Sequence, residues 1–295
     1  MTVRLPGLHW DYARHFWTVT NLKVVGENAA FIGVMACGEG MVILSGGLDL
    51  SVGAILALAS CAAAMALAAG WSWPLAVGVG LAAGTVAGFF NGALITYRRL
   101  PPIITTLATL LLFRHGTSIL THARSYGPFP DAFNRIGTDW IPAVLFAVCL
   151  ALFILASLTI RFGRWVLAIG GGEQAARLSG IAVDRVKRWA YLLSGLCAGV
   201  AGLIVMAFNN NTQSSIGTGY ELDVIAACVV GGVRITGGDG SILGAALGAL
   251  LIALLRDALI LAGRPAEQYG LFTGGVILAA ALLEQWRSRR GIQTA

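Results

Sequence analysis

Long apolar stretches separated by short polar connectors run along most of the chain. Nine such stretches are recognisable, and most are long enough for a helix to cross a hydrocarbon core of roughly 30 Å. They cover residues 29–44, 52–69, 74–96, 103–120, 140–160, 190–208, 222–233, 242–261 and 269–286. The seventh stretch is short, so its helix must be tilted, partly re-entrant or shielded by neighbouring helices. The pattern predicts an all-α polytopic membrane protein with nine spans.

Composition supports this prediction. Hydrophobic residues make up 57% of the 295 residues, charged residues only 12%, and the mean hydropathy is +0.78. A soluble chain of this composition would expose more apolar surface than soluble proteins tolerate. The net charge is +6, but most basic residues lie between the apolar stretches and do not interleave with aromatics, so no nucleic-acid partner is expected.

The basic connectors predict an orientation in the membrane. The longest connector, residues 161–188, carries six Lys or Arg residues, and the tail at 287–295 carries three. The positive-inside rule places both in the cytoplasm, and the four intervening spans agree with that placement. It leaves residues 1–28 as a polar extracytoplasmic connector, residues 29–286 as the membrane domain and residues 287–295 as a basic cytoplasmic tail.

Glycine is abundant, with 39 residues, and it recurs at intervals of four along several of the apolar stretches. Small residues at this spacing allow the backbones of two membrane helices to approach closely. The spacing therefore predicts helix packing at Gly80, Gly84, Gly88, Gly195, Gly199, Gly240, Gly244 and Gly248.

Motifs of enzyme chemistry are missing from the sequence. Neither of the two lysines, Lys23 and Lys187, belongs to a phosphate-binding loop. The four histidines do not cluster, and the five cysteines lie in apolar stretches without a metal-binding spacing, so no metal or cofactor is expected. The energy for uphill transport would therefore come from a partner or an ion gradient. An ion gradient would favour buried carboxylates, for which Glu39 and Asp257 are the candidates, although a polar partner on another helix explains each more simply.

Four motifs, in order along the chain, resemble the ribose-type sugar permeases of ABC transporters. These permeases are inner-membrane components of binding-protein-dependent importers, in a superfamily that includes branched-chain amino-acid permeases. The motifs lie at residues 45–53 (Ser-Gly-Gly-Leu-Asp-Leu-Ser-Val-Gly), 90–114, 168–180 and 219–244. The resemblance implies a bundle similar to type II ABC importers, which has ten helices. The resemblance also predicts that the family's first helix is missing here, since residues 16–22 match the connector that follows it, and a start site assigned too late or a truncated subunit would explain the difference.

Within the third motif, residues 173–179 have the pattern of a short helix. It begins with an acid, carries Arg177 near its end and stops at Gly180. The resemblance identifies it as the coupling helix that docks into the ATP-binding subunit, with small residues that permit close contact. A solvated linker helix is the alternative. The residues assigned to coupling are Glu173, Ala175, Ala176, Arg177 and Gly180.

Five polar residues in the other motifs are candidates for the solute pathway or its gate. Asp49 and Ser51 precede a helix, and Glu221 and Asp223 begin the short seventh span, so all four could instead cap helix N-termini. Asn91 belongs to the second motif.

Function follows from the resemblance. It implies a transport subunit in the bacterial inner membrane that imports a monosaccharide or a similar small polar solute and is not itself an enzyme. The expected partners are a cytoplasmic ATP-binding subunit, an extracytoplasmic solute-binding protein and a second permease copy or paralogue. Two alternatives remain open at this point: a branched-chain amino-acid permease of the same superfamily and an ion-coupled secondary transporter.

Overall fold

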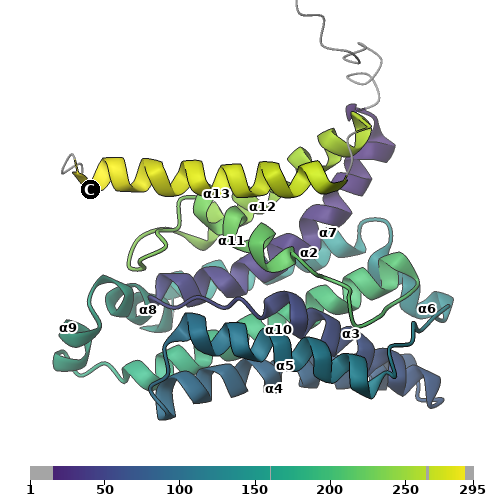
Figure 1. Ribbon diagram of the computed structural model, residues 1–295, viewed down its shortest axis with the longest axis horizontal. Helices are drawn as coiled ribbons and strands as arrows, with labels where there is room; N and C mark the ends of the chain where they lie inside the picture. The colour runs from purple at the N-terminus through teal and green to yellow at the C-terminus, as the bar shows by residue number, and fades with distance from the viewer. Residues whose placement is uncertain (1–15, 160, 264–265, 290–295) are drawn as a thin grey trace, which may run out of the picture.

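The computed structural model describes residues 16–159, 161–263 and 266–289, and within these ranges the regular structure is helical. Figure 1 shows that most helices run along the long axis of one bundle. The elements are α2 (Val19–Leu44), α3 (Val52–Ala68), α4 (Trp73–Tyr97), α5 (Pro102–Leu120), α6 (Asp131–Asn134), η1 (Arg135–Gly137), α7 (Ile141–Thr159), α8 (Arg161–Gly171), α9 (Glu173–Leu178), α10 (Val183–Asn209), α11 (Tyr220–Val230), α12 (Ile242–Leu261) and α13 (Ala266–Arg289). The predicted all-α class is confirmed for the described residues.

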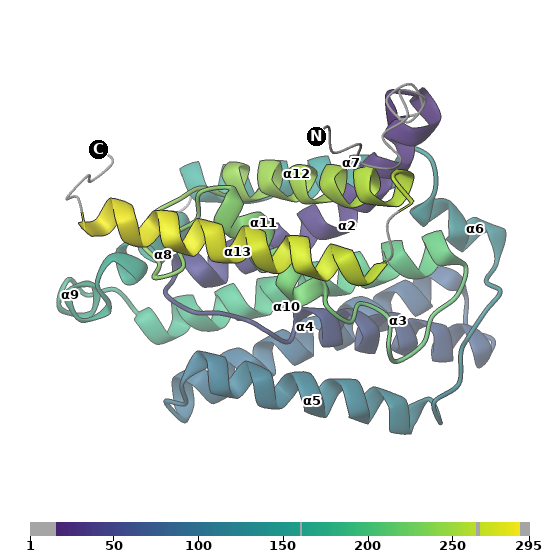
Figure 2. The same cartoon turned by 45° about the horizontal axis from the view of Figure 1, so that its top comes forward.

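The bundle has two ends, which we name after the short helices found there. The α9 end holds the loop at residues 98–101, helix α9 and the loop at residues 231–241, whereas the α6 end holds the loop at residues 69–72 and helix α6 (Figure 1). Between the ends, α5 packs mainly on α3 and α4, while α13 packs on α11 and α12 (Figure 2).

Several helices have the length and composition needed to cross a membrane. Within the described residues these are α2, α4, α5, α10 and α12, and a sixth span results if α6, η1 and α7 are taken together across a bend of 57°. Large apolar side chains on α5, among them Leu107, Leu111 and Leu112, are exposed on the outer surface of the bundle, as expected for lipid-facing residues. The structure therefore supports an α-helical membrane protein, while the count of nine spans remains a prediction.

Two segments predicted as polar connectors contain helix. Helix α2 begins ten residues before the predicted span, where the Thr18 hydroxyl accepts a hydrogen bond from the Asn21 N–H at 3.3 Å. The basic connector at residues 161–188 forms α8, α9 and the first turns of α10. The predictions for residues 1–15, for a helix preceding them and for residues 290–295 lie outside the described residues.

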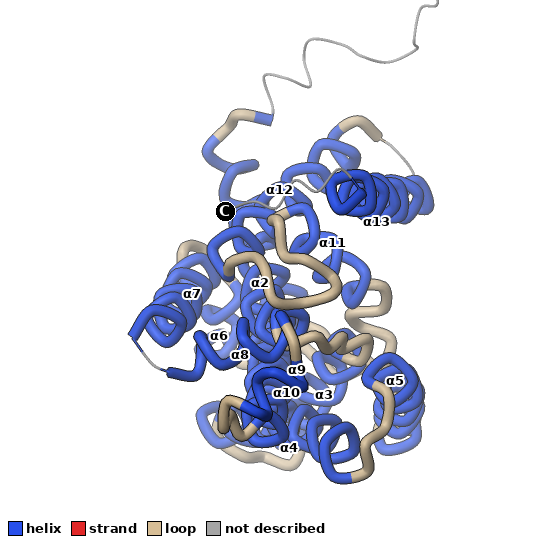
Figure 3. The backbone as a smooth tube through the Cα atoms, turned by 90° about the vertical axis from the view of Figure 1, so that its left-hand side faces the viewer, coloured by secondary structure: helices blue, strands red, loops and turns tan. Residues whose placement is uncertain are grey.

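Helix α2 lies at the centre of the bundle (Figure 3). Every residue from 29 to 44 is buried, because α7, α10, α11 and α12 pack around this segment. In such a position a helix is apolar on all sides, which explains why the sequence of α2 shows little amphipathic pattern.

Glycines join α4 to α10, as their spacing predicted. A Cβ atom added to Gly84 would lie 2.6 Å from the carbonyl oxygen of Gly195, and one added to Gly195 would lie 2.7 Å from the Cα of Gly88. Gly248 likewise faces the backbone of α11 and Gly244 faces Gly231 directly after it, whereas Gly240 lies in the loop before α12. The α4–α10 contact is thus made by backbones and cannot accommodate larger side chains.

We expect Gly88→Ala to destabilise the protein and Gly78→Ala to leave it unharmed. A Cβ at Gly88 would overlap the backbone of α10, which costs about 1–3 kcal/mol of unfolding free energy, whereas Gly78 on the same helix has open space around it. Thermal unfolding of the purified protein, followed by tryptophan fluorescence, would test this. Equal melting temperatures for the two variants would show that the α4–α10 contact is loose.

Candidate coupling site and buried polar cluster

Helix α9 is a single short helix at the end of the bundle, as the third motif predicted. Glu173 occupies its first turn, where a negative charge suits the positive end of the helix dipole. Gly180 has a φ of +81°, a conformation that favours glycine and ends the helical stretch. The helix ends at Leu178, one residue before the predicted end.

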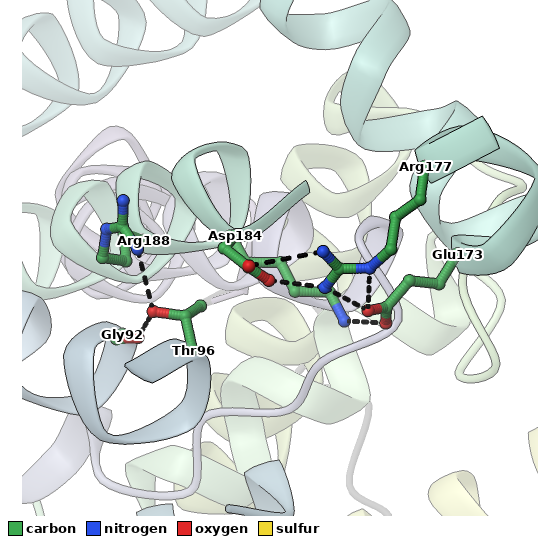
Figure 4. Close-up of polar contacts among 7 residues, drawn as sticks. Gly92, Thr96, Glu173, Arg177, Asp184 and Arg188 are labelled. Atoms are coloured by element: carbon green, nitrogen blue, oxygen red, sulfur yellow. Dashed lines mark hydrogen bonds and ion pairs between the residues drawn. The ribbon is translucent and has the colours of Figure 1, made fainter. Parts of the chain in front are cut away.

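Ion pairs hold α9 against the start of α10 (Figure 4). Arg177 Nη2 lies 2.9 Å from Glu173 Oε1 on its own helix and 2.5 Å from Asp184 Oδ1 on α10. Lys187 Nζ, also on α10, lies 2.6 Å from Glu173 Oε2. Hydrogen bonds from Lys187 and then Arg177 hold the pKa of Glu173 below its ordinary value. Each exposed pair contributes little alone, but the chain of three fixes the orientation of a helix too short to be stable by itself.

The two alanines of α9 face in different directions. Ala176 is only 4% exposed and packs into the hydrophobic core, so it anchors the helix to the bundle. Ala175 is exposed, and so is Leu178, at 84%. A fully exposed leucine on a small polar helix is a signal that sequence reasoning missed. The outward face of α9 therefore presents Ala175 and Leu178.

A groove of about 550 Å³ lies beside α9. It is bordered by the end of α4, the loop at residues 98–101, α9 and the start of α10. Its lining residues are Ile95, Thr96, Arg99, Leu100, Pro101, Pro102, Glu173, Arg177, Asp184 and Lys187. The ion pairs of α9 thus form one wall of a charged recess at this end of the bundle.

The start of α10 is also tied to α4. Arg188 Nη1 donates to Thr96 Oγ1 at 3.2 Å, and Thr96 in turn donates to the carbonyl oxygen of Gly92 at 2.7 Å (Figure 4). The Arg188 guanidinium also lies 4.4 Å from the ring centroid of Tyr97. These contacts and the glycine packing therefore join α10 to α4, while the ion pairs join α10 to α9.

Three of the predicted pathway residues meet in the interior. Asp49 Oδ1 accepts hydrogen bonds from the Ser51 N–H at 2.9 Å and from the Ser51 hydroxyl at 2.6 Å, and Asn91 Nδ2 donates to Ser51 Oγ at 2.8 Å. Glu39 joins them, because its Oε1 accepts from the Asp49 N–H at 2.9 Å. All four residues are fully buried, and we call Glu39, Asp49, Ser51 and Asn91 the polar cluster. Ser51 directly precedes α3, but its side chain forms no capping hydrogen bond with the first turn and binds Asp49 and Asn91 instead.

The remaining two candidates, Glu221 and Asp223, lie on α11 in different surroundings. Glu221 Oε1 accepts a hydrogen bond from the Gly219 N–H at 3.2 Å, which is the capping role that the sequence allowed. Asp223 faces α12 and α13, where it lies 3.9 Å from Arg256 Nη1 and accepts a hydrogen bond from Thr273 at 3.4 Å. The structure does not bring these two acids together at one site.

The match to known proteins covers nearly the whole chain. Residues 27–281 match the family model described as the branched-chain amino acid transport system permease component. The chain belongs to this family. The ribose import permease protein of Bacillus subtilis (strain 168) is 41% identical to this chain over 280 residues, which cover 91% of this chain and 85% of that protein.

Two further relatives are similarly close. The ribose import permease protein of Escherichia coli (strain K12) is 36% identical over 283 residues, covering 92% of this chain and 87% of that protein. The L-arabinose transport system permease protein of the same strain is 34% identical over 284 residues, covering 94% of this chain and 86% of that protein. No solved structure matches the chain. The resemblance predicted from the four motifs is confirmed, and the matched range includes every candidate site residue.

Proposed function

We propose that this protein is the membrane-embedded permease subunit of a bacterial ABC importer for a monosaccharide or a similar small polar solute. The observation that carries the proposal is the similarity over nine-tenths of the chain to permeases named for ribose and L-arabinose. Residue types in the described interior agree with it, because the carboxylates and amide of the polar cluster are groups that bind hydroxyls.

Coupling to ATP is assigned to α9. In this proposal Ala175 and Leu178 enter a groove of a cytoplasmic ATP-binding subunit, and Glu173, Arg177 and Gly180 set the direction and end of the helix. Ala176 holds α9 to the bundle. Movement of the ATPase subunits would then reach α4 through α10, whose first turns bind both α9 and α4.

The assembly and topology proposed here follow from the same family membership. Two permease copies or paralogues enclose the solute path, and an extracytoplasmic binding protein delivers the solute. The α9 end of the bundle faces the cytoplasm together with the C-terminus, which the basic residues of the 161–188 segment favour. Nine spans with a type II arrangement complete the proposal, with α3 and α11 as spans shorter than the membrane core.

Two rival functions differ from this one in substrate or in energy source. The description of the matching family model favours a branched-chain amino-acid permease. However, the ribose and L-arabinose permeases to which the chain is similar are named for sugars. An ion-coupled transporter would use a buried carboxylate. Asp257 Oδ2 accepts a hydrogen bond from Asn21 on α2 at 2.6 Å, which is the polar partner on another helix expected of a structural carboxylate. Glu39, which is fully buried, is the carboxylate that such a transporter would use.

Ligand screening of the cognate binding protein tests the substrate class. The binding protein encoded beside this permease would be titrated with pentoses, hexoses, leucine, isoleucine and valine, and its melting temperature recorded. We expect a sugar to raise the melting temperature by several degrees and the amino acids to have no effect. Stabilisation by the amino acids alone would identify a branched-chain amino-acid permease and overturn the proposal.

A further inference from the structure

Two helices, α3 and α11, begin inside the bundle instead of at one of its ends. Ser51, the residue before α3, binds Asn91, which lies six residues, or roughly 9 Å, before the end of α4. At the start of α11 the Tyr220 ring stacks on Phe31 at 5.1 Å, and Phe31 lies thirteen residues, or roughly 20 Å, before the end of α2. Both helices therefore start at depth, well away from the α9 end.

The N-termini of α3 and α11 meet. A Cβ on Gly53 would lie 2.5 Å from the carbonyl oxygen of Gly217 and would overlap the Glu221 carboxylate. Gly217 itself has a φ of +71°, and a Cβ there would lie 3.0 Å from the carbonyl oxygen of Gly53. From this point α3 runs toward the α6 end and α11 toward the α9 end (Figure 1). We call this contact between Gly53, Gly217 and Glu221 the helix junction.

Four buried acceptor oxygens belong to the polar cluster and to the helix junction. Glu39 Oε2, Asp49 Oδ2, Asn91 Oδ1 and Glu221 Oε2 are buried and receive no hydrogen bond from the described residues. Buried polar groups without a partner are uncommon in folded proteins, so four such oxygens on neighbouring segments point to a functional requirement. The positive ends of two helix dipoles offset part of the negative charge, as does Arg114, which donates to the carbonyl oxygens of Ser214 and Ile216 next to the junction.

The ligand that this arrangement favours carries several hydrogen-bond donors and no negative charge. Sugar hydroxyls meet that description, since each can donate to a carboxylate or amide oxygen while its own oxygen accepts from a backbone N–H at a helix N-terminus. A free branched-chain amino acid offers donors only at its ammonium group, which the acids would attract, whereas its carboxylate cannot donate and would be repelled by them. The unpaired acceptors thus match a neutral polyol better than they match an amino acid.

We propose that the helix junction and the polar cluster together form the gate of the solute path, and that the four acceptor oxygens bind solute hydroxyls when the gate opens. This inference rests on the proposed function. In the structure the polar cluster is fully buried, which corresponds to a closed gate. Asn91 provides the link to the coupling site, because it belongs to α4, and a shift of α4 with α10 would withdraw Asn91 from Ser51.

Accessibility of Ser51 during transport tests the gate. Ser51→Cys would be made in the full importer, reconstituted with its ATPase subunit and binding protein, and the modification of residue 51 by a small methanethiosulfonate reagent followed by mass spectrometry. We expect at least tenfold faster modification during ATP turnover than at rest. Ser60→Cys is the matched control, because Ser60 is equally buried on the same helix and binds Thr212 away from the junction. Its modification should stay slow in both states.

Three outcomes decide the inference. Slow modification of Ser51→Cys in an importer that transports its sugar would overturn the proposal of a gate. If the Ser51→Cys variant does not assemble, Asn91→Cys is tested in the same way. Modification during turnover that saturating sugar does not slow would overturn hydroxyl binding at this place. A wild-type complex without any ATP-driven sugar uptake would instead refute the proposed function, which keeps the two failures distinguishable.

Discussion

Replacing Arg177 by glutamate should reduce ATP-driven uptake at least tenfold while leaving the protein folded. The substitution would place three carboxylates together, at residues 173, 177 and 184, where Arg177 now lies 2.5 Å from Asp184 and 2.9 Å from Glu173. Like charges at these distances repel, so α9 would leave its position on α10. The pairs are exposed, and stability of the bundle should change by less than about 1 kcal/mol. Uptake and retention of the ATPase subunit on affinity-tagged permease would both be measured.

Arg185→Glu is the control for this prediction. Arg185 is exposed on the first turns of α10 and takes no part in the ion pairs of α9, so the same change of charge should leave uptake within about twofold of the wild type. Normal uptake and normal ATPase retention by the Arg177→Glu variant would show that α9 is a solvated linker helix instead of a coupling helix.

The second large effect is expected at Asp49. Replacement by leucine keeps the branched shape of the side chain, with bulkier methyl groups in place of the oxygens, and removes the oxygen that accepts hydrogen bonds from the backbone and hydroxyl of Ser51. Each buried donor left without an acceptor costs about 1–3 kcal/mol, so the melting temperature should fall by several degrees or the protein should fail to fold. Thermal unfolding in detergent measures this effect.

Asp49→Asn separates stability from transport. Its side chain retains one acceptor oxygen, so the fold should survive with a melting temperature close to that of the wild type. The second carboxylate oxygen, Oδ2, which we propose accepts a hydrogen bond from the solute, becomes an amide NH2 group that donates. Uptake should therefore fall at least fivefold. A variant that folds and also transports at the wild-type rate would reduce Asp49 to a structural role.

Helix ends were predictable where the local chemistry is strong. Pro101 and Pro102 place the start of α5, and Gly180 ends the α9 stretch, because these residues restrict or permit backbone conformations within a few positions. Asp49, Ser51 and Asn91 could be selected as polar residues in conspicuous motifs. The structure joins them by hydrogen bonds, and their role in transport stays a prediction.

Features that depend on tertiary contacts could not be predicted from the sequence. The pairing of adjacent alanines in α9 suggested one docking surface, but residues one position apart on a helix point about 100° apart, so Ala176 is buried and Ala175 exposed. Glu39 gave no sign that it binds the Asp49 N–H, since its partner lies beyond the end of its own helix. The contact between the N-termini of α3 and α11 joins segments more than 150 residues apart in the sequence. The short length of the seventh apolar stretch indicated an unusual helix there but did not indicate its partner.

The energy source for transport is the most direct test of the proposed function. The permease, its ATPase subunit and its binding protein would be reconstituted in liposomes, and uptake of the sugar found in the ligand screen measured with and without ATP on the ATPase side. We expect uptake that requires ATP and all three components, and that persists when ionophores abolish proton and sodium gradients. Uptake by the permease alone, driven by either gradient without ATP, would contradict the assignment to an ABC importer.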